Sequence, residues 1–286
     1  MLDRAAAAPH RRPVIDLDRY FARIGLPWSG RDPRTPTLDT LNQIVAAHVM
    51  AIPFENLDVL LGRPIDLDLG AIQRKLIDDR RGGYCFEQNS LLLAVLTQLG
   101  FEARPLSGRV RFGRPRDYTP ARTHLVVRVE LDASWLVDVG IGALSMSAAI
   151  RLDTAEPQAT LHEPRRLVRD GNLVFHQARF GDDWHDVYEL TLEEMPPIDR
   201  EVANWYTCAH PQSHFKHRLS VSRALPEGRR ISLLNRELTL RERDGRGHHR
   251  MIESPDELLA VLDEHFGLAF PPGTRFPCPG LDWPAG

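Results

Sequence analysis

Three residues in the middle of the chain have the types and the order of a thiol-based catalytic centre. Cys85 comes first, His124 follows, and Asp138 comes a short way after the histidine. An imidazole beside a cysteine sulfur can hold a thiolate–imidazolium pair and then act as acid and base. A carboxylate can orient that imidazolium. The three residues therefore indicate covalent chemistry in which a thiolate attacks a carbonyl group.

The local sequence around the cysteine favours its ionised form. Gly82 and Gly83 predict a flexible turn, and an apolar helical segment begins at Cys85. The start of a helix carries about half a positive charge and unpaired N–H groups. These favour a thiolate and could stabilise an oxyanion. Glu87, in the first turn, opposes the thiolate unless a base such as Arg81 neutralises it.

Each of the three residues also has a structural interpretation, which the residues alone leave open. Cys85 could be a small buried side chain that only packs. His124 could be a rim histidine at the end of a strand, and Asp138 could bond the local backbone before Gly140. Geometry adds a difficulty: a tight turn at residues 132–134 places Asp138 four residues from the histidine, roughly 13 Å along the strand. A triad then requires a slipped register, a bulge or a longer loop.

The elements that must position these residues change in type along the chain. Apolar residues at helical spacing predict helices over the first hundred residues, with Thr37 and Asp68 as N-caps and a buried helix from about Cys85 to Leu99, closed by Gly100. Period-two alternation then predicts antiparallel strands. We expect strands at about 125–131, 135–139, 173–180, 186–192 and 231–241.

The order of these elements indicates an α+β protein. In the last third, Ser254-Pro255-Asp256-Glu257 is a capping box that should start a helix. We place domain boundaries near residues 100 and 205. This gives three predicted domains, at 1–100 with the nucleophile, 101–205 with the histidine and aspartate, and 206–286.

Composition limits the classes of function. The chain has 286 residues, 42% of them hydrophobic, a formal net charge of −3 and three cysteines. The near-neutral charge gives no case for a nucleic-acid partner. The alanine run at residues 5–8 is too short for a signal-peptide core, and no stretch approaches the roughly 20 apolar residues of a membrane span. The few cysteines fit a reducing compartment, so we expect a cytoplasmic protein without a membrane partner.

Three short motifs together resemble the arylamine N-acetyltransferase family. That family has a cysteine in RGGxCxExN, a histidine in THL and an aspartate in VDVGFG. This chain has RGGYCFEQN at 81–89, THL at 123–125 and VDVGIG at 137–142. PFENL at 53–57 and NWYT…HPQSHF at 204–215 are also similar. The likeness covers about residues 15–220 in order, and the combination of motifs is far more specific than any one of them.

The resemblance implies a helical bundle, a central antiparallel β-barrel and a C-terminal α/β lid around a cysteine-protease-like Cys-His-Asp core. It implies a ping-pong reaction in which acetyl-CoA, as co-substrate, acetylates Cys85 and an arylamine or arylhydrazine then takes the acetyl group. His124 and Asp138 inherit the roles of base and orienting acid. The implied contacts to CoA are Thr123, Gly142 and Ser213, and the implied acceptor pocket includes Phe54 and Ile141.

One position departs from the family pattern. Ile141 stands where the family has a phenylalanine that lines the acceptor pocket. We therefore expect an altered ranking of amines, with acetyl transfer itself retained. The physiological amine, the range of acyl donors and the oligomeric state are left open by the sequence, and an oligomer is compatible with it.

Two clusters outside the three motifs, and three rival functions, also bear on this interpretation. The histidines of HPQSHFKH lack helical patterning, so we expect no metal site there. One or two arginines of a basic stretch before His124 could meet the phosphates of CoA; these are Arg109, Arg111, Arg114, Arg116 and Arg122. The rival functions are an amide synthase that closes a macrolactam in polyketide biosynthesis, a thiol hydrolase or transglutaminase-like enzyme, and a binding protein with an inactive triad.

Overall fold

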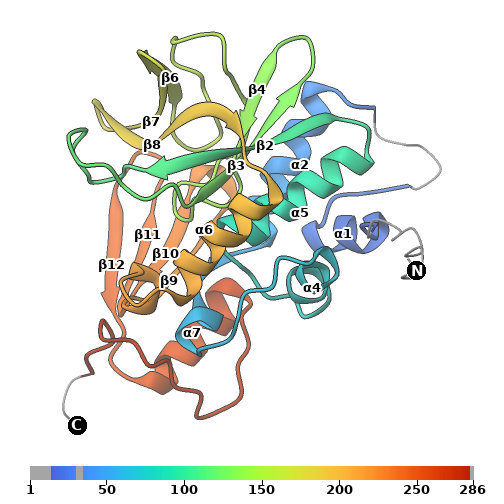
Figure 1. Cartoon of the computed structure of the whole chain (residues 1–286). Helices are drawn as coiled ribbons and strands as arrows, with labels where there is room; N and C mark the ends of the chain where they lie inside the picture. The colour runs from blue at the N-terminus through green and yellow to red at the C-terminus, as the bar shows by residue number, and fades with distance from the viewer. Residues whose placement is uncertain (1–13, 30–34, 284–286) are drawn as a thin grey trace, which may run out of the picture.

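The computed structural model describes residues 14–29 and 35–283 of the chain. The alanine run considered above lies outside them. Figure 1 shows the helices and two sheets in the order α1 Leu17–Ile24, α2 Leu38–Ala51, β1 Phe54–Glu55, α3 Leu57–Leu60, α4 Leu69–Gln73, α5 Cys85–Gln98, β2 Glu102–Val110, β3 His124–Glu130, β4 Ser134–Val137, β5 Ile150–Arg151, β6 Arg165–Asp170, β7 Leu173–Phe180, β8 Asp183–Glu194, α6 Pro197–Ala209, β9 Ser220–Ala224, β10 Arg230–Leu234, β11 Glu237–Arg241, β12 Gly247–Met251 and α7 Pro255–Phe266.

The predicted helix ends are confirmed by their caps. Thr37 accepts a hydrogen bond from the backbone of Thr40 at the start of α2, and Asp68 caps α4. Ser254 caps α7, and Pro255 occupies its first position. These side chains satisfy N–H groups that a helix leaves unpaired. A π-helical turn at Arg74–Asp78, which the sequence pattern did not predict, follows α4.

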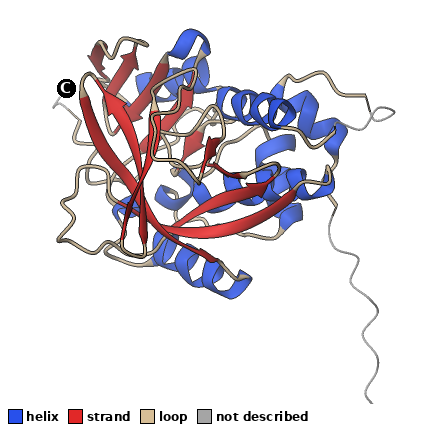
Figure 2. Cartoon of the chain, turned by 90° about the horizontal axis from the view of Figure 1, so that it is seen from above, coloured by secondary structure: helices blue, strands red, loops and turns tan. Residues whose placement is uncertain are grey.

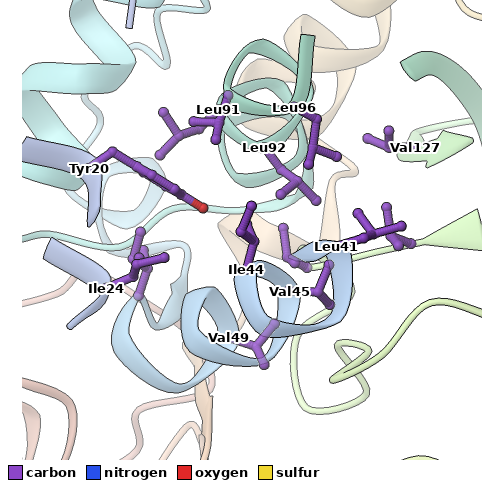
Figure 3. Packing of buried hydrophobic residues seen from close by; sticks show 14 of the residues in the cluster. Tyr20, Ile24, Leu41, Ile44, Val45, Val49, Leu91, Leu92, Leu96 and Val127 are labelled. Carbon is purple, nitrogen blue, oxygen red and sulfur yellow. The ribbon is translucent and has the colours of Figure 1, made fainter. Parts of the chain in front are cut away.

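The helical part of the chain is held by one apolar core. Figure 3 shows side chains of α1, α2 and α5 packed against one another, with Val127 of β3 joining them. Leu41, Leu92 and Leu96 are completely buried. Burying a leucine contributes about 1.5–3 kcal/mol, so this cluster fixes α5 firmly on the sheet. The helix that begins at Cys85 therefore has a rigid seat.

The larger sheet has seven antiparallel strands in the order β5-β4-β3-β2-β8-β7-β6. Its two edges are joined through Gln158. The backbone of Gln158 exchanges two hydrogen bonds with Arg165 of β6, at 2.7 and 2.9 Å. Its side-chain amide bonds the backbone of Arg151 in β5 at 2.7 and 3.1 Å. The sheet thus curls into a nearly closed barrel, as Figure 2 shows from above, with most of the helices to its right.

The second sheet has five antiparallel strands in the order β1-β9-β10-β11-β12. The single strand predicted at 231–241 is wrong: the chain turns back after Leu234, and Leu234 of β10 pairs with Glu237 of β11. Polar Asn235 adopts a positive φ of 52° in this turn, as asparagine tolerates. Helix α7 packs its apolar face on this sheet in a separate core.

The two sheets and the helices confirm the α+β class. The domain boundaries near 100 and 205 stay predictions: α5 ends at Gln98, just before the first, whereas α6 spans the second, and β1 pairs with a strand of the C-terminal sheet. Within the described ranges, 14–29 and 35–283, no helix is long and apolar enough to cross a bilayer.

Candidate active site

The two glycines before Cys85 allow the start of α5 to pack closely against the PFENL segment. Glu55 of β1 donates its backbone N–H to the carbonyl of Gly83 at 3.0 Å, and Gly83 donates to Pro53 at 3.3 Å. A side chain at Gly82 would place its Cβ 2.1 Å from the Pro53 carbonyl oxygen. Neither glycine has a positive φ. The flexible turn predicted here is therefore wrong, since both glycines hold the start of α5 tightly against the PFENL segment.

The structure brings the three predicted catalytic residues together in a buried group. The ring Nε2–H of His124 donates to Oδ2 of Asp138 at 2.7 Å. The other ring nitrogen is then left for Cys85, whose interaction with His124 helps to raise the pKa of the imidazole. Cys85 is 5% exposed, His124 1% and Asp138 0%. Water therefore has little access to the pair, so the charges on these groups act on each other at a low local dielectric.

The register of β3 and β4 removes the expected separation of histidine and aspartate. Arg128 pairs with Leu136, and Glu130 pairs with Ser134. The predicted pairing of Arg128 with Asp138 is thus wrong, because the loop lies at 131–133, one residue earlier than the expected turn at 132–134, and this shift moves the partner of Arg128 by two residues. The same register, continued one step past β4, sets Asp138 opposite Val126. This is two residues from His124, or about 7 Å along the strand, a distance that the two side chains span.

Asn89 holds the aspartate from the helix side, and the sequence reasoning assigned it no role. Its Nδ2 donates to Oδ1 of Asp138 at 2.8 Å and to the carbonyl of Leu125 at 2.6 Å. Its Oδ1 accepts the N–H of Val139 at 3.0 Å. Asn89 lies one helical turn after Cys85, so helical spacing from Cys85 was the signal that could have identified it.

Gly140 lets the aspartate turn approach the helix. Its N–H donates to Oδ1 of Asp138 at 2.9 Å. A Cβ at this position would lie 2.6 Å from the Cα of Cys85 and 2.8 Å from Nδ2 of Asn89. The distance between Cys85 and Asp138 therefore depends on the absence of a side chain at Gly140.

Tyr188 of β8 lies behind the imidazole, and it too was missed. Its ring centroid is 5.1 Å from that of His124. Its hydroxyl donates to the sulfur of Met146 at 3.8 Å. Burial together with the Asp138 charge raises the pKa of Tyr188 well above its ordinary value, so the phenol stays protonated beside the carboxylate. No local sequence signal marks this residue, because it lies on a distant strand.

The surroundings of His124 favour its charged form. Burial alone lowers the pKa of the imidazole, but the charge and hydrogen bond of Asp138, with a smaller contribution from Cys85, raise the pKa to about 10. An imidazolium is therefore available near neutral pH as a partner for a thiolate. His176 of β7 is kept neutral instead, since burial and the Arg165 charge lower its pKa well below the ordinary value.

Glu87 is neutralised by a different base from the one expected. Lys75 Nζ lies 2.7 Å from Glu87 Oε1 and 2.8 Å from Asp58. Arg81, the predicted partner, pairs with Glu55 at 2.6 Å and with Asp58 at 3.3 Å. The second oxygen of Glu87 accepts the N–H of Tyr84 at 3.0 Å, which completes the N-terminal cap of α5. The negative charge in the first turn is thus bound to a cation and to the backbone, away from the sulfur.

Some of the predicted contacts to CoA and to the acceptor lie beside Cys85, and others pack elsewhere. Phe54 belongs to the same buried cluster as Cys85, and a Cβ on Gly142 would lie 3.5 Å from the Phe54 ring. The carbonyl of Thr123 accepts from the Cys85 thiol at 3.6 Å. Ile141 is half-buried and packs toward the barrel core. Ser213 is buried, and its hydroxyl donates to the backbone carbonyl of residue 207.

No group of three or more histidine, cysteine or acidic side chains with the arrangement of a metal site is found among the residues that the structure describes. The histidines of HPQSHFKH are separated by their contacts: His217 bonds the Pro211 carbonyl at 2.7 Å, and the His210 ring stacks on Tyr206. The three cysteines are all free thiols.

Comparison with known proteins identifies the family. A family model described as N-acetyltransferase matches residues 37–273. The chain is 44% identical over 260 residues to an arylamine N-acetyltransferase of Mycolicibacterium smegmatis, with 89% of this chain and 92% of that protein covered. It belongs to the arylamine N-acetyltransferase family. It is also 40% identical over 253 residues to the arylamine N-acetyltransferase of Escherichia coli strain K12, with 88% of each covered.

Solved structures of this family share the fold. The Mycobacterium marinum arylamine N-acetyltransferase in complex with CoA matches with a TM-score of 0.82 at 39% identity, covering 88% of this chain and 92% of that one. The resemblance predicted from the three motifs is therefore confirmed, and so is the α+β class of the fold. The arylamine N-acetyltransferase relatives give no support to the macrolactam-closing alternative.

Proposed function

We propose that this protein transfers the acetyl group of acetyl-CoA to arylamines and arylhydrazines through a thioester on Cys85. The observation that carries the proposal is the 2.7 Å bond of His124 to buried Asp138, with the remaining ring nitrogen directed to the cysteine. This is the geometry of an activated nucleophile whose base is oriented by a third group. The relatives named above are arylamine N-acetyltransferases, and one of their structures contains CoA.

The first half-reaction follows from the charges at the site. The Cys85 thiolate attacks the thioester carbon of acetyl-CoA, and the C–S bond to CoA breaks as the tetrahedral intermediate collapses. His124, as imidazolium, gives its proton to the departing CoA thiolate. The backbone N–H groups of Cys85 and Phe86 have no acceptor among the described residues, so they are free to stabilise the oxyanion at the start of α5.

The second half-reaction uses the same groups in reverse. The amine nitrogen attacks the acetyl-cysteine carbonyl, and neutral His124 takes the amine proton. Collapse of the intermediate returns the electron pair to sulfur and releases the amide. Asp138 keeps the imidazole in one tautomer and orientation through both steps. The product carries the acetyl group on nitrogen, and the thiolate–imidazolium pair is restored.

The arginines before His124 differ in their availability to the phosphates of CoA. Four of the five face carboxylates: Arg109 and Arg111 pair with Glu189, Arg116 with Asp186, and Arg122 with Glu193. Arg114 forms no ion pair with any described residue; its guanidinium lies 5.0 Å from the Tyr118 ring centroid.

Arg114 is close to Arg218, a second cation for which the described part of the chain holds no ion-pair partner. Burial and the charge of Arg114 together lower the pKa of Arg218. Burial and both arginines lower the pKa of His214 to about 4, so that histidine stays neutral. The Arg218 carbonyl accepts from Asn56, which also bonds Phe215 beside the Cys85 cluster. We infer that Arg114 and Arg218 bind a phosphate of CoA near the Cys85 cluster, since two like charges side by side are stabilised by an anion.

Donor selectivity tests this pair of arginines. Arg114→Gln and Arg218→Gln should each raise KM for acetyl-CoA roughly 10- to 100-fold, as loss of one charged hydrogen bond does. KM for p-nitrophenyl acetate, which has no phosphate, should be unchanged. Arg104→Gln, which alters an exposed arginine paired with Glu102 and Glu194, is the matched control. Equal effects on both donors would remove the phosphate assignment.

We also propose residues of the acceptor site, contacts to CoA and a cellular location. Phe54 and Gly142 form an apolar wall next to Cys85, to which an aryl ring can stack, and Ile141 continues the turn that bears Gly142. Thr123, Gly142 and Ser213 are proposed as CoA contacts, and Ser213 would make its contact through the backbone because its hydroxyl is already engaged. A cytoplasmic location agrees with three unpaired cysteines.

Mass spectrometry after brief exposure to acetyl-CoA tests the central step. One adduct of about 42 Da should form on Cys85 and disappear when an arylamine is added. Cys208→Ser and Cys278→Ser should still form it, and Cys85→Ser should not. An adduct on Cys208 or Cys278 in the wild-type protein, or none at all, would reject the proposed mechanism.

A further inference from the structure

A cavity of about 440 Å³ lies on the helical side of the molecule, away from the catalytic group. Its lining comes from α5 through Leu93 and Ala94, from α4 through Leu69 and Ile72, and from the first turn of α6. These helices are adjacent in Figure 1. The volume falls in the range of about 300–1,000 Å³ typical of small-molecule sites. Cys85 and its partners face another side of α5.

A single cation without a partner lies in this largely apolar lining. Arg200, in the first turn of α6, has no ion pair or side-chain hydrogen bond with any described residue, and its Nε is buried without an acceptor. Burial lowers the pKa of the guanidinium, which the Glu201 charge only partly opposes. A buried donor without an acceptor costs about 1–3 kcal/mol, more when charged.

The N-terminus of α6 adds partial positive charge to the cavity wall that carries Arg200. The helix has 13 residues, starts with Pro197, and its N-cap Pro196 has no side chain that can accept from the first turn. The helix dipole therefore directs partial positive charge toward the cavity. Glu201, which also lines the cavity, and Asp199, in the first turn of α6, are the opposing charges, and both lie on the exposed surface. The wall that carries Arg200 would attract an anion, and the opposite wall, formed by α4 and α5, would contact an apolar group.

We propose that this cavity is a second ligand site, separate from the acetyl-transfer site, which binds small apolar carboxylates with the carboxylate on Arg200 and the hydrocarbon part against α4 and α5. A guanidinium presents a planar fork that matches a carboxylate in two parallel hydrogen bonds. The alkyl or aryl portion covers Leu93, Ala94 and Ile72. An amine of the same length is excluded, because it would set a second cation beside Arg200.

Calorimetric titration with octanoate tests the site without using enzyme activity. The wild-type protein should bind octanoate, and octylamine should not bind at the same concentrations. Arg200→Gln should weaken octanoate binding at least tenfold. Ala94→Trp, which fills the cavity from the floor, should abolish binding. Arg104→Gln, on a distant strand, is the matched loss of one arginine and should bind as the wild type does.

The outcomes separate this site from the catalytic one. Because binding is measured without acetyl-CoA, a failed acetyl-transfer mechanism leaves the test intact. Octanoate binding that persists in both Arg200→Gln and Ala94→Trp would place the ligand elsewhere and overturn the proposal, as would no binding by the wild type at millimolar octanoate. If Arg200→Gln does not fold, as judged by circular dichroism and thermal melting, Ala94→Trp alone decides.

Discussion

Replacing Gly140 with alanine would place a methyl group between the Asp138 turn and the helix that carries the nucleophile. The new Cβ would start 2.6 Å from the Cα of Cys85, whereas ordinary contacts begin at 3.4 Å. The two backbones must therefore separate by about 0.8 Å, and a displacement near 1 Å costs up to about 10²-fold in rate. We expect kcat/KM for acetyl-CoA to fall roughly 10- to 100-fold, or about 1.4–2.7 kcal/mol in activation free energy.

Single-turnover acetylation with stopped-flow detection of released CoA measures this effect directly. Overpacking also destabilises the fold by about 1–3 kcal/mol, so a matched variant is needed. Gly280→Ala sets a Cβ 2.4 Å from the Asn235 side chain, in the C-terminal part of the chain. It should lower Tm and leave the acetylation rate unchanged. A folded Gly140→Ala protein that acetylates within twofold of the wild type would refute the argument that this contact sets the triad distance.

Three further predictions concern the charges and the acceptor wall. Asp138→Asn should lower kcat/KM about 10³-fold or more. The substitution should also remove the contribution of charged His124 to the free energy of unfolding. In the wild type this contribution is complete below pH 6.5, the ordinary pKa of histidine, and it is lost as the pH rises through about 10, the pKa of His124. Equal dependence of unfolding on pH in the two proteins would contradict this. Lys75→Met leaves Glu87 buried without its cation, so the free energy of unfolding should fall by about 3–5 kcal/mol at pH 7. Since burial raises the pKa of Glu87 in the folded state, part of that loss should return at pH 5, and denaturant titrations that show no recovery would argue against it. Ile141→Phe should change the relative kcat/KM values across a series of arylamines and hydrazines, and an unchanged ranking would exclude this side chain from the acceptor wall.

The sequence predicted those features that depend on neighbouring residues. Thr37, Asp68 and Ser254 cap their helices as expected, because a cap acts within three residues of its own position. The order of Cys85 and its two partners, with the motifs around them, was enough to predict the family. These signals are local in the chain, so they needed no knowledge of how distant elements pack.

The features that the sequence did not predict depend on packing between distant elements. The register of β3 and β4 follows from a three-residue loop that lies one residue earlier in the chain than the expected turn, and such a shift leaves no strong mark in the sequence. The base that neutralises Glu87 was wrongly predicted as Arg81, because the π-helical turn brings Lys75 there instead. Tyr188 reaches Asp138 only because β8 lies next to β2 in the barrel.

The buried carboxylate explains why the triad needs residues beyond its three members. Asp138 is completely buried, so its charge must be stabilised by the protein. Three donors form hydrogen bonds with that charge, namely the Asn89 amide, the Gly140 N–H and the His124 imidazole, and the protonated Tyr188 hydroxyl lies beside them. They come from α5, the turn after β4, β3 and β8, so the negative charge is set where helices and barrel meet. The proton on His124, and through it the proposed role of Cys85, therefore depends on the helices and the barrel being docked together.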